Sequence, residues 1–146
     1  MPTPLNNLTS LRIARPVTNL DRAQAMYCAG LDLRVIGRFE DHAGFDGVML
    51  GRTDLPYHFE FTYCRNHPVT PSPTPEDITV FYLPDTDTGT DTDTHTWQLT
   101  CAQMLAAGFK QVPSFNPYWD QRGATFLDED GYRTVLQNAA WQPVQA

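Results

Sequence analysis

Apolar and polar residues alternate along several short stretches of the chain, and two other stretches repeat their apolar residues at helical spacing. The first alternating stretch, Leu11–Val17, is typical of a strand with one buried face. The residues after it carry the signals of a helix. Thr18 or Asn19 can cap its start, Asp21 suits the helix dipole in the first turn, and Gly30 is expected to end it. One face of this helix is apolar: Leu20, Ala23, Met26 and Tyr27.

Three further strand signals follow and complete the order β-α-β-β-β: Leu33–Phe39, Gly47–Gly51 and Tyr57–Tyr63. Residues 65–77 contain four prolines. Proline lacks an amide hydrogen and restricts the residue before it, so this segment is predicted to be a stiff connector without regular structure. The order then repeats, with a strand, a helix and three strands: Ile78–Leu83, about Thr96 to Gly108, Phe109–Val112, Gly123–Leu127 and Tyr132–Asn138.

The repeat is also visible in the residues themselves. Three pairs of segments match in the same order: Cys28–Leu31 with Ala106–Phe109, Asp46–Leu50 with Arg122–Phe126, and Tyr57–Phe61 with Tyr132–Leu136. Three ordered matches indicate a duplicated unit. We therefore expect one α+β domain over residues 1–146, made of two βαβββ modules at about 11–64 and 78–141. Their sheets are expected to curl around a shared cleft.

Composition narrows the class of protein. The chain has 146 residues, of which 41% are hydrophobic, enough for one domain with its own core. Its three cysteines form no CxxC pair, which favours a reducing compartment. Because the sequence shows neither a leader pattern nor a long apolar run, we expect a cytoplasmic protein without a membrane partner. The net charge of -7 argues against nucleic acid as a partner.

Two motifs resemble those of a known superfamily. Residues 17–31 resemble its first-module pattern V-x-D-L-x-x-(S/A)-x-x-F-Y…L-G-L. Gly123–Leu136, with its Asp-Glu-Asp-Gly turn, is similar to G-x-x-x-x-F-x-D-P-D-G-Y-x-x-x-L. From about Leu11 to Trp141 the chain thus resembles the vicinal-oxygen-chelate superfamily, which includes glyoxalases, bleomycin resistance proteins and dioxygenases. Asn116–Trp119 resembles a smaller branch, the YycE-like proteins.

The resemblance implies where a metal would bind. Metal-dependent members use one ligand on the first strand of each module and a glutamate on the last. At these positions the present chain has Arg12 and Glu60 in the first module, and Ile78 and Val135 in the second. Arginine is always a cation, and the two aliphatic side chains offer no lone pair, so only Glu60 can coordinate a divalent ion. We therefore expect no metal cofactor.

Strand alternation places His58 and Glu60 on the cleft face of their strand, with Arg12 facing them from the first strand. One interpretation is a partly buried ion pair of Arg12 with Glu60 that replaces the lost ion. Another is that Arg12 holds a ligand carboxylate or carbonyl, while Glu60 and His58 act as catalytic groups that orient the ligand or accept a proton. A third is that His58 and Glu60 share a metal.

Further cleft-lining residues are expected from the first and last strands of the second module and from the segment before Gly123: Tyr82, Arg133, Tyr118 and Trp119. Three aromatic side chains of this module have two interpretations: Phe115, Tyr118 and Trp119. They either cap the cleft or make a subunit contact, or they form an aromatic wall for a flat or cationic ligand. The acidic segment Asp85–Thr94 lacks the order of an EF-hand loop and is expected to be a solvated loop.

Three functional hypotheses follow. The first is a homodimer that binds a small molecule without metal, as bleomycin resistance proteins do. The second is a divalent-metal-dependent lyase, isomerase or dioxygenase with an atypical site around His58 and Glu60. The third is a structural or interaction domain. The sequence leaves open the identity of the ligand, the pairing of modules within or between chains, and the role of residues 85–94.

Overall fold

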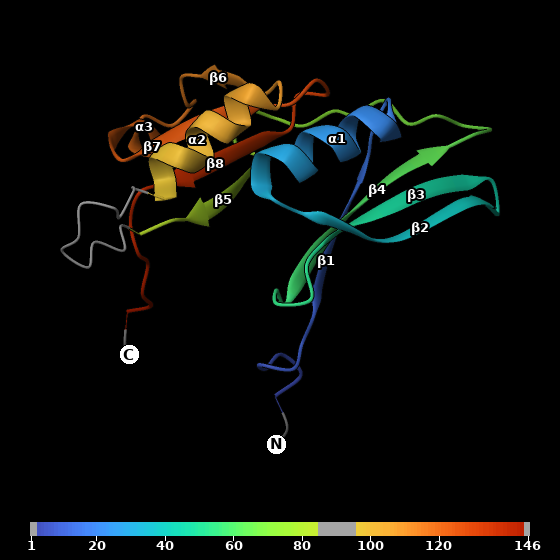
Figure 1. The fold of residues 1–146 in the computed structure, drawn as a ribbon, viewed down its shortest axis with the longest axis horizontal. Coiled ribbons are helices and arrows are strands. Elements are labelled where there is room, and N and C mark those ends of the chain that lie inside the picture. Colours follow the sequence, from blue (N-terminus) through green and yellow to red (C-terminus); the bar gives the residue numbers. More distant parts are fainter. Residues whose placement is uncertain (1–2, 85–95, 145–146) are drawn as a thin grey trace. The chain divides into compact units, whose positions relative to one another are not determined.

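Within the described residues, eight strands form two four-stranded sheets, one in each half of the chain (Figure 1). The structure is a computed structural model that describes residues 3–84 and 96–144. The chain divides into two compact units, which hold residues 1–28 with 32–71 and residues 29–31 with 72–146. Each sheet combines one parallel pair of strands with antiparallel pairs. The α+β fold class with two βαβββ modules is thereby confirmed.

Five elements belong to the first unit, except that the last three residues of α1 group with the second. Their bounds lie close to the predicted ones: β1 (Leu11–Pro16), α1 (Leu20–Leu31), β2 (Arg34–His42), β3 (Phe45–Gly51) and β4 (Tyr57–Cys64). Its strand order is β1-β4-β3-β2, with β1 parallel to β4. Alternation along β4 decides which side chains meet α1. Phe59 and Phe61 are buried, and the ring of Tyr27 from α1 lies 4.8 Å from that of Phe61. The opposite face of β4 is left to His58 and Glu60.

The ends of α1 show one correct and one wrong prediction. Asn19 caps the start, because its side chain accepts a hydrogen bond from the amide of Arg22 at 3.0 Å. Gly30 does not end the helix, which continues to Leu31. Asp32 takes the left-handed conformation instead, with φ of 53°. A short polar side chain tolerates that conformation, and Arg52 holds the residue by donating to its carbonyl at 3.0 Å.

The second unit repeats the order of the first and adds one short helix: β5 (Ile78–Tyr82), α2 (Thr96–Ala106), β6 (Lys110–Val112), α3 (Tyr118–Gln121), β7 (Gly123–Leu127) and β8 (Arg133–Gln137). Its strand order is β5-β8-β7-β6, with β5 parallel to β8. α2 runs along β8, where the indole of Trp97 donates to the carbonyl of Leu136 at 2.7 Å. Met104, Phe126 and Leu136 are fully buried and form the core of this unit.

The Asp-Glu-Asp-Gly segment forms a tight turn between β7 and β8. The side chain of Asp128 accepts hydrogen bonds from the amides of Asp130 and Tyr132, both at 2.9 Å. Gly131 has a φ of +92°, which a residue with a side chain rarely adopts. This turn sets the register of β8, on which Arg133 is the first residue.

Residues 65–77 contain neither helix nor strand, as their prolines predict. The Asp85–Thr94 segment lies outside the described residues. Within residues 3–84 and 96–144, no helix is long and apolar enough to cross a membrane.

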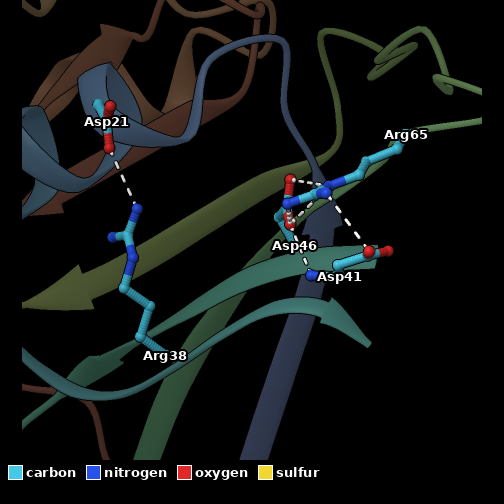
Figure 2. A network of polar contacts seen from close by, with 5 residues as sticks. All are labelled: Asp21, Arg38, Asp41, Asp46 and Arg65. Carbon is cyan, nitrogen blue, oxygen red and sulfur yellow. Dashed lines mark hydrogen bonds and ion pairs between the residues drawn. The ribbon is translucent and has the colours of Figure 1, made fainter. Parts of the chain in front are cut away.

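Arg65, the residue after β4, ties the β2–β3 hairpin to the end of β4 (Figure 2). Its guanidinium lies 2.9 Å from the carboxylate of Asp46 and 3.5 Å from that of Asp41. Asp46 also accepts a hydrogen bond from the amide of Asp41 at 2.9 Å. A separate pair joins the hairpin to α1, in which Arg38 lies 3.2 Å from Asp21 (Figure 2).

Asp46 is expected to make the first unit sensitive to acid. The hydrogen bond from Arg65, and then that from the amide of Asp41, lower the pKa of the Asp46 carboxyl below its ordinary value of 3.8. A lowered folded-state pKa means that the ionised group stabilises the fold above pH 3.8, and that this contribution is lost as the pH falls through the folded-state pKa. We expect Asp46→Asn to flatten the fall in unfolding free energy below that pH. Urea unfolding of both proteins across the acid range measures this effect.

Asp21→Asn is the control for this comparison, because that carboxylate is 87% exposed. If the unfolding free energies of the wild type and of Asp46→Asn fell equally steeply as the pH is lowered, the expected contribution of Asp46 would be contradicted.

Candidate functional site

Three polar side chains meet on the face of the first sheet that carries His58 and Glu60. β1 and β4 are parallel, and their register places Arg12 beside His58 and Ala14 beside Glu60. The Nε of Arg12 donates a hydrogen bond to Nε2 of His58 at 2.9 Å. Its Nη1 donates to Oε2 of Glu60 at 3.3 Å, so the ion pair expected between these two residues is present. The Glu60 side chain is only 15% exposed, whereas that of Arg12 is 49% exposed.

The hydrogen bond from Arg12 indicates which ring nitrogen of His58 carries the proton. A guanidinium can only donate, so Nε2 of His58 must offer its lone pair and the ring proton must reside on Nδ1. The same guanidinium engages an oxygen of Glu60. One permanent cation therefore contacts both groups that a metal would need as ligands in this module.

The second unit offers no replacement ligands at the equivalent positions. Its parallel pair places Ile78 beside Arg133 and Val80 beside Val135, in the same register as the first unit. Ile78 thus corresponds to Arg12, Arg133 to His58 and Val135 to Glu60. Within the described residues, no three His, Cys, Asp or Glu side chains gather where they could hold an ion. The residues present do not fit the metal site of the superfamily.

A small pocket, with about 310 Å³ of empty space that is partly open to solvent, lies within the second unit. It is bounded by the segment before α3, by the end of the connector and by one face of the sheet: Pro75, Glu76, Ile78, Ser114, Phe115, Asn116, Trp119, Thr125 and Arg133. Strand register places Ile78, Thr125 and Arg133 on the same face. The hydroxyls of Ser114 and Thr125 are hydrogen-bonded to each other.

The segment that forms the wall of this pocket is held by its own side chains. The carboxylate of Asp120 accepts a hydrogen bond from the amide of Ser114 at 3.1 Å. Oδ1 of Asn116 accepts one from the amide of Tyr118 at 3.0 Å, which starts α3. The ring of Tyr118 stands edge-on to that of Trp119, 4.9 Å between centroids. The aromatic side of the pocket therefore comes from Phe115 and Trp119, while Tyr118 packs on the ring of Trp119 outside the pocket.

Arg133 is the one cationic residue among those that line the pocket. Its Nη1 is buried and has no hydrogen-bond partner among the described residues. Glu76, which also lines the pocket, is exposed to solvent. A buried donor without a partner costs about 1–3 kcal/mol, so the pocket favours a group that can accept from Arg133.

The expected site residues fall into two groups. Arg12, His58 and Glu60 come together in the first unit, while Trp119 and Arg133 line the pocket of the second. Two other predicted residues do not line that pocket. Tyr82 lies at the other end of β5, beside Gln137, and Tyr118 is 53% exposed.

Several pocket residues were not predicted as ligand contacts: Glu76, Ser114, Asn116 and Thr125. Alternation along β7 could have indicated Thr125, because it shares a face with Val135. Ser114 and Asn116 lie in an irregular segment, where no periodic signal exists.

The fold and the duplicated modules define a protein of the glyoxalase-like, vicinal-oxygen-chelate class. Glyoxalase I of Leishmania major has the same fold, with a TM-score of 0.63 and 18% identity over 88% of this chain and 84% of that one. The antibiotic binding protein TnmS3 of Streptomyces sp. CB03234 also has this fold, with a TM-score of 0.61 and 14% identity over 94% of this chain and 99% of that one.

Within this class, the chain belongs to the YycE-like family. The model of the YycE-like N-terminal domain matches residues 11–62, and that of the YycE-like C-terminal domain matches residues 76–138. Protein YycE of Bacillus subtilis (strain 168) is 38% identical over 129 residues, 88% of this chain and 87% of that protein. A crystal structure of a Bacillus subtilis YycE protein of unknown function has a TM-score of 0.81 and 35% identity over 94% of this chain and 95% of that one.

Proposed function

We propose that this protein binds a small molecule without a metal ion, in the manner of bleomycin resistance proteins. One observation carries the proposal. Arg12 donates hydrogen bonds to both His58 and Glu60, the two side chains expected to share a metal in the alternative site.

Electrostatics supports this proposal. A cation beside the guanidinium would be repelled by roughly 4 kcal/mol per unit of charge at about 4 Å and an effective dielectric constant of about 20. For a divalent ion this doubles to roughly 8 kcal/mol, and exposure of the Arg12 side chain reduces it. The carboxylate of Glu60 offsets part of this repulsion, but two ligands from one module leave little binding energy to overcome the remainder. A neutral ligand meets no such barrier.

The proposal also covers the location of the protein, its oligomeric state and its partners. The antibiotic binding role of TnmS3, which shares the fold, is consistent with a binding function. We further propose a cytoplasmic homodimer with a small-molecule ligand and neither nucleic acid nor membrane as a partner. The net charge of -7 disfavours contact with phosphate backbones.

Equilibrium dialysis of the untagged protein against Mn²⁺, Ni²⁺ and Zn²⁺ tests the proposal. We expect far less than one equivalent of each metal on the wild type, and no further loss in Glu60→Ala. Arg12→Gln removes the charge and frees both potential ligands, so its Zn²⁺ affinity is expected to rise about tenfold or more. Stoichiometric metal on the wild type that disappears in Glu60→Ala would overturn the proposal in favour of a metal-dependent enzyme.

A further inference from the structure

We propose that the ligand is an organic anion, with a carboxylate or phosphoryl group attached to a flat apolar ring, and that Arg133 binds its anionic group in the pocket of the second unit. This inference rests on the proposed binding function and adds the chemical class of the ligand. It also differs from the cationic ligand considered above for the aromatic residues Phe115, Tyr118 and Trp119.

The guanidinium groups of Arg12 and Arg133 differ in their hydrogen-bond and ion-pair partners. Arg12 contacts a carboxylate and an imidazole within hydrogen-bond distance. Arg133, at the position equivalent to His58, has Val135 where the first module has Glu60. Its Nη1 is buried without a partner, and it forms no ion pair with another described residue. Among the described residues, the second guanidinium therefore has no acidic partner in an ion pair, and it lies in a partly enclosed pocket.

The other pocket residues suit the two parts of such a ligand. The hydroxyls of Ser114 and Thr125 are hydrogen-bonded to each other, which leaves one hydroxyl hydrogen of the pair to donate to an anionic oxygen. Oδ1 of Asn116 is already engaged by the amide of Tyr118, which leaves its amide NH₂ group as a donor. Trp119 and Phe115 add aromatic surface next to these donors, where a flat ring can pack.

Glu76 is the one acidic residue that lines the pocket, and it does not reverse this preference. It is exposed, so water screens its charge, whereas Arg133 is partly buried. A guanidinium binds carboxylate and phosphoryl oxygens through paired hydrogen bonds, which are stronger than those between neutral groups. The pocket therefore selects the anion over its neutral analogue.

Benzoate, phenyl phosphate, benzamide and inorganic phosphate are suitable probes, titrated into ¹⁵N-labelled full-length protein. The indole NH signal of Trp119, assigned with Trp119→Phe, reports binding. We expect saturable millimolar binding of benzoate, of phenyl phosphate or of both, and at least about tenfold weaker binding of benzamide and of inorganic phosphate. The stronger of the two aryl anions identifies the anionic group that the pocket prefers.

Arg133→Gln is expected to weaken the binding of the preferred aryl anion about tenfold or more, and Arg133→Lys to restore part of it. Arg122→Gln is the matched control, because it makes the same charge change at an exposed arginine outside the pocket residues and should leave the affinity unchanged. Several results would overturn the inference: no saturable binding of either aryl anion, equal binding of benzamide, equal binding of inorganic phosphate, or full affinity in Arg133→Gln. Metal analysis of the same samples keeps the two proposals distinct, since stoichiometric metal would defeat the metal-independent function whatever the aryl anions do.

Discussion

Replacing Phe61 with alanine is expected to lower the free energy of unfolding by about 3–5 kcal/mol. The side chain is fully buried in the centre of the first unit. It packs against the ring of Tyr27 from α1 at 4.8 Å and lies 6.3 Å from the ring of Phe59. Truncation would leave a cavity between α1 and β4, and neither element can collapse into it without disturbing the sheet.

Phe45→Ala is the matched control, because this aromatic residue lies on the neighbouring strand of the same unit and is 44% exposed. It should cost less than about 1 kcal/mol. Urea unfolding followed by circular dichroism gives both values. Equal losses from the two variants would contradict the assignment of Phe61 to the core.

Gly123→Ala is expected to destabilise the second unit by about 1–3 kcal/mol and to displace α3. A Cβ at this position would lie 2.6 Å from the carbonyl oxygen of Trp119 and 3.2 Å from that of Leu136, and would also collide with the Gln137 side chain. Backbone oxygens cannot rotate away, so α3 or β8 must shift. Because Trp119 lines the pocket, the same substitution should weaken the binding of aryl anions.

Gly37→Ala provides the comparison. There the added Cβ would meet the terminal methyl of Met49, the flexible end of a side chain that can turn aside. This variant should stay within about 0.5 kcal/mol of the wild type. Thermal unfolding together with the Trp119 indole signal tests the pair. A neutral Gly123→Ala with an unmoved signal would show that α3 does not pack tightly on β7.

Most of the fold could be predicted from the sequence, because the strands alternate regularly and the modules repeat each other. The short helix α3 could not be, since four residues give no periodicity. Gly30 was a wrong helix end because aspartate at position 32 can adopt the same left-handed conformation. These differences concern helix ends and short segments, where local hydrogen bonds decide the structure.

The site was predictable only in part. The facing of Arg12 and Glu60 followed from strand alternation, but the contact of Arg12 with His58 depends on the parallel register of β1 and β4. The lack of a partner for Nη1 of Arg133 among the described residues could not be predicted, since it depends on which groups the irregular segment around Ser114 brings near it. Individual pairings therefore required the structure.

The central claim is that a guanidinium, rather than a metal ion, holds His58 and Glu60. A long-range ¹H–¹⁵N spectrum of the histidine rings, recorded with and without one equivalent of Zn²⁺, tests it most directly, with the His58 signals assigned from His58→Gln. The account predicts a neutral ring protonated at Nδ1, whose Nε2 signal does not change when Zn²⁺ is added. A saturating shift of the His58 Nε2 signal at one equivalent of Zn²⁺ would contradict it.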